Sequence, residues 1–271
     1  MHCGQGRPAW NKGPIMVGTY NSLLVLLSIL VAIFVSYTAL SLSARVARAK
    51  NGTNTGLWVV VGSLAMGCGI WSMHFIGMLA FSLPIPLTYD LGLTIASLVI
   101  AIAISGFALS VASNPEISIV QMAFSALIMG AGISAMHYSG MAAIDLVPMI
   151  TYEPLLMAAS ILIAVGASFA ALWLFFQLRE GNSLGMRLAR VGAALVMGVA
   201  ISGMHYTGMA ASRFSARSFC TGGASVNTGS LAITTTVVAF VVLTVTTTFL
   251  VIESRRDAVA RKRVERLDAA A

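Results

Sequence analysis

Predominantly apolar stretches of twenty or more residues recur along the chain, and they restrict its possible folds more than any other feature. At 1.5 Å per residue, each stretch is long enough as a helix to cross a hydrocarbon layer about 30 Å thick. Because lipid offers the backbone no hydrogen-bond partners, spanning segments of this kind form helices. Hydrophobic residues make up 58% of the chain and charged residues only 9%, a balance that excludes an ordinary soluble domain. We therefore expect an all-α membrane protein.

The sequence predicts seven transmembrane helices, at residues 16–42, 57–82, 91–112, 118–144, 155–178, 191–213 and 231–252. All seven prolines fall outside these ranges, in connections where a fixed φ angle and a missing N–H group end helices. We therefore divide the chain into an external N-terminal segment (1–15), a seven-helix membrane domain (16–252) and a basic tail (253–271).

The basic residues predict the orientation of the helices. Twelve of the 16 lysines and arginines lie after the first, third and fifth helices or in the C-terminal tail. The positive-inside rule therefore places the N-terminus outside and the C-terminus in the cytoplasm. Basic flanks beside anionic lipid also account for the net charge of +7, so no nucleic-acid partner is expected.

One motif occurs three times, in the second, fourth and sixth expected helices. It reads M-G-x-x-I-x-x-M-H-[FY]-x-G-M and covers residues 66–78, 129–141 and 197–209. Each repeat contains two helices, so all three repeats have the same orientation in the membrane. We expect the first six helices to form three parallel helical hairpins in a pseudo-threefold arrangement, which brings the motifs to one depth near the axis.

The motif histidines are His74, His137 and His205, and each is followed at a similar distance by polar or helix-ending residues. This spacing places all three about 12 Å below the external boundary. Positions −8, −4, 0 and +4 relative to histidine share one helix face. The glycines at −7 and +3 lie beside that face and allow close helix packing, so the motif is expected to face the interior of the bundle.

Three equivalent imidazoles inside a membrane need partners, because an unpaired polar group is costly in hydrocarbon. Methionines at −1 and +4 supply thioethers nearby, and imidazole with thioether suits copper, Cu(I) above all. The absence of carboxylates argues against calcium, magnesium or manganese, and the shortage of thiolates argues against structural zinc. The candidate metal ligands are His74, His137, His205, Met78, Met141, Met209, Met73, Met136 and Met204.

The same residues also allow other interpretations. The histidines can be hydrogen-bonded packing residues, ligands on a Cu(I) transport path, or, for two of them, axial ligands of a haem. Tyr138 and Tyr206 follow their histidines, but Phe75 takes this position in the first repeat, so packing or a hydrogen bond in two repeats is expected. We find no nucleotide-binding loop and no catalytic-triad spacing, and therefore expect no enzyme activity of this chain itself.

The tail from Glu253 to Ala271 is charged and is expected to be helical. Its residues Ala260, Val264, Leu267 and Ala271 follow the 4-3-4 spacing of a coiled-coil seam. A homodimer formed through the tail is one interpretation, and a basic segment on the membrane surface is the other.

The motif copies Met136-His137-Tyr138-Ser139 and Met204-His205-Tyr206-Thr207, with Met73-His74-Phe75-Ile76 as a divergent copy, resemble the MHYT domain of bacterial membrane signalling proteins. The resemblance covers about residues 15–255. It implies a multi-pass sensor in the bacterial inner membrane that binds copper, detects O2, CO or NO, and signals to the cytoplasm. A change of redox state is an alternative signal that we expect such a copper site to detect. Many members of that family carry diguanylate cyclase, phosphodiesterase, kinase or DNA-binding domains after the last helix. The chain is therefore expected to be a stand-alone sensor or the sensory part of a longer protein.

Overall fold

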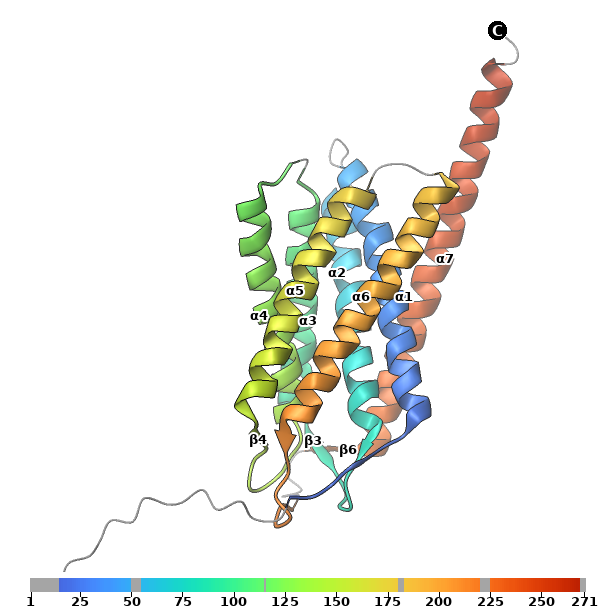
Figure 1. The fold of residues 1–271 in the computed structure, drawn as a ribbon. Coiled ribbons are helices and arrows are strands. Elements are labelled where there is room, and N and C mark those ends of the chain that lie inside the picture. Colours follow the sequence, from blue (N-terminus) through green and yellow to red (C-terminus); the bar gives the residue numbers. More distant parts are fainter. Residues whose placement is uncertain (1–14, 50–54, 115, 180–182, 220–224, 269–271) are drawn as a thin grey trace, which may run out of the picture.

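The computed structural model describes residues 15–49, 55–114, 116–179, 183–219 and 225–268. In these ranges, α1 to α6 form a bundle and α7 packs against its outside (Figure 1). Each of the seven helices is long and apolar enough to cross a membrane, which confirms the expected fold class. Their bounds are α1 (Ser22–Ala49), α2 (Thr55–Leu79), α3 (Leu91–Ala112), α4 (Ile119–Ala142), α5 (Pro154–Leu178), α6 (Leu184–Ala211) and α7 (Thr228–Asp268). The expected N-terminal segment lies outside the described residues except for Ile15.

The first six helices form a closed ring in which each packs against the next and α6 packs against α1. The motif helices α2, α4 and α6 alternate with the connecting helices α1, α3 and α5. The glycines at −7 mark the closest approaches, because a Cβ atom there would meet a Cα atom of the facing helix at 2.5–2.7 Å. These contacts are Gly67 with Ile102, Gly130 with Val165 and Gly198 with Ile33. Each motif helix therefore packs on the connecting helix of the next repeat, and the third repeat closes on the first.

Short strands cover one end of the bundle, which we call the strand end, and α7 extends beyond the opposite, tail end (Figure 1). The strands form three antiparallel pairs, β1 (Thr19–Tyr20) with β2 (Phe81–Ser82), β3 (Thr88–Asp90) with β6 (Ser225–Asn227), and β4 (Thr151–Tyr152) with β5 (Ser212–Arg213).

Each repeat also closes at the strand end through an equivalent backbone bond. Each connecting helix begins with a residue whose side chain caps the helix. The backbone N–H of this residue donates to a carbonyl in the same repeat, six residues after the motif histidine. The three bonds are Asn21 to Ala80 (2.8 Å), Asp90 to Ala143 (2.7 Å) and Glu153 to Ala211 (2.8 Å). The first six helices are thus three equivalent hairpins in a pseudo-threefold arrangement, as expected.

Some helix ends differ from those that apolarity predicts. The first helix begins at Ser22 instead of 16, and the second ends at Leu79 instead of 82. The residues just before the first helix form β1 and those just after the second form β2, and these two strands pair with each other. The sixth begins at Leu184 instead of 191. Arg190 can lie within it, because its guanidinium donates two bonds to the Leu178 carbonyl at the end of α5, at 2.8 and 3.1 Å.

The seventh helix runs without interruption from the strand end into the expected helical tail. It packs against α2, where Ala239 lies in a buried cluster with Met73 and Ile76. Ile76 takes the position that Ser139 and Thr207 have in the other two motifs. Of the three motif helices, α2, which carries Ile76, is the one that α7 covers. The divergence of the first motif therefore has a packing reason. The side chains of the predicted dimer seam lie outside the described residues, so that interpretation stays a prediction.

Candidate metal centre

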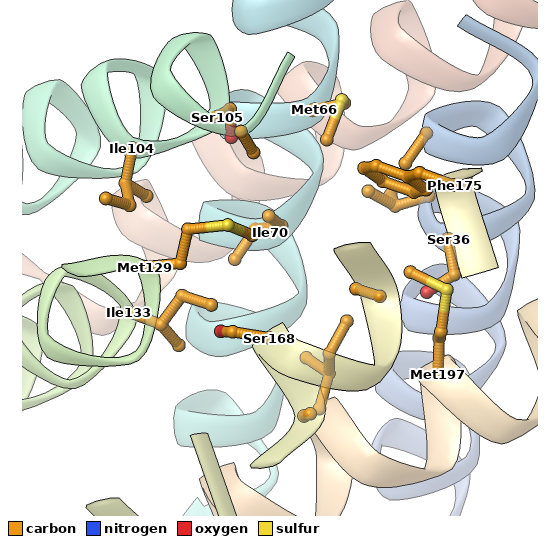
Figure 2. Close-up of a pocket in the computed structure, with 16 residues that line it drawn as sticks. Ser36, Met66, Ile70, Ile104, Ser105, Met129, Ile133, Ser168, Phe175 and Met197 are labelled. Carbon is orange, nitrogen blue, oxygen red and sulfur yellow. The ribbon is translucent and has the colours of Figure 1, made fainter. Parts of the chain in front are cut away.

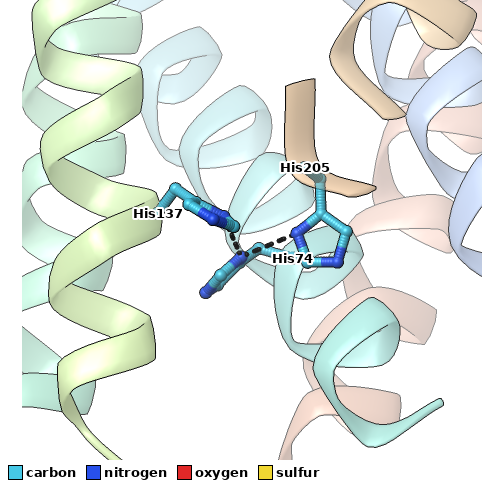
Figure 3. A group of neighbouring side chains, drawn as sticks. All are labelled: His74, His137 and His205. Carbon is cyan, nitrogen blue, oxygen red and sulfur yellow. Dashed lines mark hydrogen bonds between the residues drawn. The ribbon is translucent and has the colours of Figure 1, made fainter. Parts of the chain in front are cut away.

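The three motif histidines meet at the centre of the bundle, one from each motif helix (Figure 3). Each is 1% exposed. Their rings pack edge to face, with centroids 4.9, 5.1 and 5.2 Å apart. The Nδ1 atom of His74 lies 3.1 Å from Nδ1 of His205 and 3.2 Å from Nδ1 of His137. The predicted convergence of the three repeats at one depth is therefore confirmed.

The spacing of these nitrogen atoms suits one shared metal ion. The three histidines each offer a ligand atom, and these atoms all lie within 4.8 Å of one another. Nitrogens that bind one ion at about 2.0 Å lie about 3.3–3.5 Å from each other in trigonal or tetrahedral coordination. Hydrogen bonding alone satisfies the trio poorly, because a neutral Nδ1 carries either one hydrogen or one lone pair, whereas Nδ1 of His74 faces two neighbours. The donor set therefore fits a metal ion.

The other nitrogen of each ring packs against the glycine at +3 in the motif of the next repeat. A Cβ atom on that glycine would lie 2.3 Å from Nε2, in the pairs His74 with Gly140, His137 with Gly208 and His205 with Gly77. Among the described residues, none of the three Nε2 atoms has a hydrogen-bond partner. The glycine at +3 is thus required by the imidazole itself, in addition to the close helix packing that the sequence predicts.

The tyrosine after each of two histidines is held by the connecting helix of the next repeat. Tyr138 shares a 2.6 Å hydrogen bond with Ser160, and Tyr206 shares a 2.7 Å bond with Ser28. Both tyrosine rings pack edge-on against their own histidine, with centroids 4.8 Å apart. The expectation of a tyrosine hydrogen bond in two repeats is confirmed, and these bonds help to fix the orientation of the imidazoles.

The first repeat makes the equivalent bond from a different position. Phe75 packs edge-on against His74 at 5.0 Å but has no hydroxyl group. Trp71, one turn earlier, donates its indole N–H to Ser97 at 3.1 Å. All three connecting helices therefore use an equivalent serine to bind an aromatic residue of a motif helix, and in the first repeat Trp71 packs on Phe75 with centroids 4.7 Å apart.

The alignment of the motif helices alone missed these serines. They recur at the same place in each connecting helix, and a second serine follows eight residues later in all three. The two sets are Ser28, Ser97 and Ser160, then Ser36, Ser105 and Ser168. An alignment that included the connecting helices would have found both sets.

The candidate methionine ligands are buried at two levels around the trio. Met78, Met141 and Met209 lie one turn from the histidines toward the strand end and are at most 4% exposed. Met73, Met136 and Met204 directly precede the histidines and are at most 3% exposed. Met73 belongs to the same buried cluster as Ala239 of α7. The role of all six as metal ligands stays a prediction.

Comparison with known proteins adds an independent finding. A family model described as MHYT, bacterial signalling protein N-terminal repeat, matches the chain three times, over residues 67–125, 130–186 and 198–259. The first two matches join a motif helix to the connecting helix on which it packs. No solved structure matches the chain.

Three curated proteins show the extent of the similarity. The chain is 51% identical over 245 residues to the bifunctional diguanylate cyclase/cyclic di-GMP phosphodiesterase MucR of Pseudomonas aeruginosa, covering 90% of this chain and 36% of that protein. It is 41% identical over 197 residues to the signaling protein YkoW of Bacillus subtilis, covering 72% and 24%. It is 42% identical over 193 residues to the cyclic di-GMP phosphodiesterase NbdA of Pseudomonas aeruginosa, covering 71% and 24%. The chain thus spans well under half the length of each relative.

Proposed function

Because this chain belongs to the MHYT family of bacterial signalling proteins, we propose that it is a membrane sensor domain in which His74, His137 and His205 bind one copper ion. The observation that carries the proposal is the meeting of three buried Nδ1 atoms at distances that suit a shared ion. A buried trio of this kind is costly in a membrane unless something binds it.

Copper is favoured by the chemistry of the donors. The cluster of metal-ligating groups among the described residues consists of the three histidines, without a carboxylate or a thiolate. Neutral imidazoles with thioethers one turn away suit Cu(I) better than harder or thiolate-seeking ions. We propose Met78, Met141 and Met209 as further ligands, with Met73, Met136 and Met204 as alternatives.

Bound copper supplies an exchangeable coordination position and one-electron redox chemistry, which suit detection of a diatomic gas (O2, CO or NO) or of redox state. The residues of the chain orient the site. Packing of Nε2 on the motif glycines sets the position of each ring. Phe75, Tyr138 and Tyr206 pack edge-on against their own histidines and restrict the rotation of those rings.

The signal is proposed to pass through α2 to α7. Met73 and Ile76 flank His74 on α2, and both belong to the buried cluster that contains Ala239 of α7. A change at His74 that moves α2 therefore alters the packing of α7, which can favour one of two arrangements.

We place the domain in the bacterial inner membrane, with the strand end outside and the tail end in the cytoplasm, on the strength of the basic residues. Two of the relatives are named for cyclic di-GMP turnover. Control of that turnover in a longer protein is accordingly the output that we propose for this sensor.

The packing around the trio favours a resident metal over the two alternatives. On the tail side, Leu40, Leu109 and Leu172 are at most 1% exposed and lie in one apolar cluster. Beyond the methionines at −8, such a core disfavours a path for copper transport, because its leucines offer an ion no ligands. The separation of 3.1–3.2 Å between imidazole nitrogens leaves no space for a haem between two of them.

Metal analysis of the purified chain tests this function. After anaerobic loading with Cu(I) and removal of excess metal, we expect one copper per chain, and X-ray absorption should show nitrogen ligands. The triple variant His74→Ala/His137→Ala/His205→Ala should lose the copper, whereas His2→Ala, which removes the fourth histidine of the chain, should retain it. Circular dichroism identifies any variant that is unfolded. Copper that is absent from the wild type, or that remains in a folded triple variant, would refute the assignment.

A further inference from the structure

A second feature lies on the pseudo-threefold axis, on the tail side of the histidines. It is a cavity of about 60 Å³ between the six helices (Figure 2). The isoleucine at −4 and the methionine at −8 of every motif line it, together with one serine and one alanine at equivalent positions of each connecting helix. The cavity is therefore built by all three repeats, like the histidine trio, and is not a local packing gap.

The cavity is close to the trio. The lining isoleucines, Ile70, Ile133 and Ile201, lie one turn before the histidines on the same helix faces. Four residues correspond to about 6 Å along a helix. A molecule in the cavity would therefore be separated from the imidazoles only by the ring of isoleucines.

The lining restricts the chemistry of an occupant. Most of it is hydrocarbon, with three thioethers, which disfavours a hard ion or a strongly polar molecule. Ser105 and Ser168 also line the cavity, are 2% and 1% exposed, and have no hydrogen-bond partner for Oγ among the described residues. The equivalent Ser36 instead donates to the Ala32 carbonyl at 2.8 Å. Two buried hydroxyl groups are thus free to meet a weakly polar guest.

We propose that this axial cavity binds one small uncharged molecule of the size of a diatomic gas, at a site separate from the metal centre. A dry apolar cavity of about 150 Å³ can bind benzene or xenon. A cavity of about 60 Å³ is too small for benzene but has room for one xenon atom or one diatomic molecule. The link to sensing rests on the proposed function, since a molecule held here would lie one helical turn from the copper. The cavity itself does not depend on the metal.

Xenon is the probe, because it is apolar, uncharged and visible by its anomalous scattering. Crystals of the wild-type chain under xenon pressure should show one xenon peak in the axial cavity, with or without copper. Ala108→Leu fills the cavity from α3 and should abolish the peak, and Ala171→Val is a milder filling variant from α5. Ala103→Leu is the matched control, because Ala103 lies on α3 but is exposed outside the bundle.

The outcomes separate this proposal from the proposed function. No xenon peak in the wild type, an ordered water that xenon does not displace, or an undiminished peak in both filling variants would overturn the cavity assignment. Copper content is measured on the same samples, and the filling variants should retain it. Loss of xenon with retained copper supports the cavity, whereas xenon binding in a wild-type chain that takes up no copper leaves the cavity standing and removes the metal centre.

Discussion

The Nε2 atom of His205 packs so closely on Gly77 that a Cβ atom on residue 77 would lie only 2.3 Å from it. The first repeat must therefore have a glycine at this position to accommodate the histidine of the third repeat. His74 with Gly140 and His137 with Gly208 repeat the relationship at the same distance. Each repeat supplies a histidine to the next and receives one from the previous repeat. The histidine cluster is therefore completed only when the ring of helices is closed.

Gly77→Ala should displace His205 and weaken Cu(I) binding by about 10–100-fold, the usual effect of disturbing the support of a ligand. Gly203→Ala is the control, because a Cβ atom there meets nothing within 4 Å. Alanine also favours a helix over glycine by about 1 kcal/mol, so the control variant should be at least as stable as the wild type. Competition with a chromophoric Cu(I) chelator measures both affinities, and equal values would contradict the packing role of Gly77.

Trp71→Ser/Phe75→Tyr converts the first repeat to the pattern of the other two. Trp71→Ser alone removes a buried ring and its bond to Ser97, and should cost about 3–5 kcal/mol. Adding Phe75→Tyr should recover about 1 kcal/mol, because the new hydroxyl can reach the freed serine. Chemical unfolding of the two single variants and the double variant measures the coupling. Strict additivity of the two changes would show that the positions are not exchangeable.

Ala239→Leu enlarges the α7 side chain that packs in the same cluster as Met73 and Ile76. We expect a loss of about 1–3 kcal/mol in stability from overpacking. If α7 and the metal centre are coupled, Cu(I) affinity should also change by at least about fivefold, because coupling between two sites is reciprocal. Val237→Leu, on the exposed face of α7, should change neither quantity. An unchanged affinity in a destabilised Ala239→Leu variant would argue against signalling through this contact.

Removal of copper should lower the thermal stability of the chain. A ligand that binds only the folded state stabilises it by about 2.7 kcal/mol when its free concentration is 100 times its dissociation constant. A Cu(I) chelator should therefore lower the melting temperature of the wild type and of His2→Ala, but leave that of the triple histidine variant unchanged. Tryptophan fluorescence during heating is a suitable measurement. A chelator effect of equal size in the triple variant would place the bound copper elsewhere.

The sequence was sufficient to predict that the histidines converge, because helix parity and a shared helix face constrain both depth and direction. It did not indicate which repeat each histidine packs against. The spacing of His205 and Gly77 along their own helices contains no information about the neighbour, which depends on how the ring closes between α6 and α1.

The serine bonds were harder to predict for a different reason. Ser97 has the same place in its helix as Ser28 and Ser160, but its partner moved by one turn, from position 75 to Trp71. When the three motifs are compared position by position, Phe75 indicates that the first repeat lacks the hydrogen bond made by the tyrosines. Only the three-dimensional packing reveals that the neighbouring turn supplies the same bond.

The cyclic contact between histidine and glycine also has a consequence for origin. One hairpin contains both residues but cannot bring them together, since its partner is always on another hairpin. Three separate copies around a true threefold axis could make all the contacts at once. The chain thus has the internal plan of a homotrimer joined into one polypeptide. Covalent joining lets one repeat differ from the other two. The first repeat does so at Trp71, Phe75 and Ile76, on the helix that α7 packs against. Identical subunits cannot differ in this way.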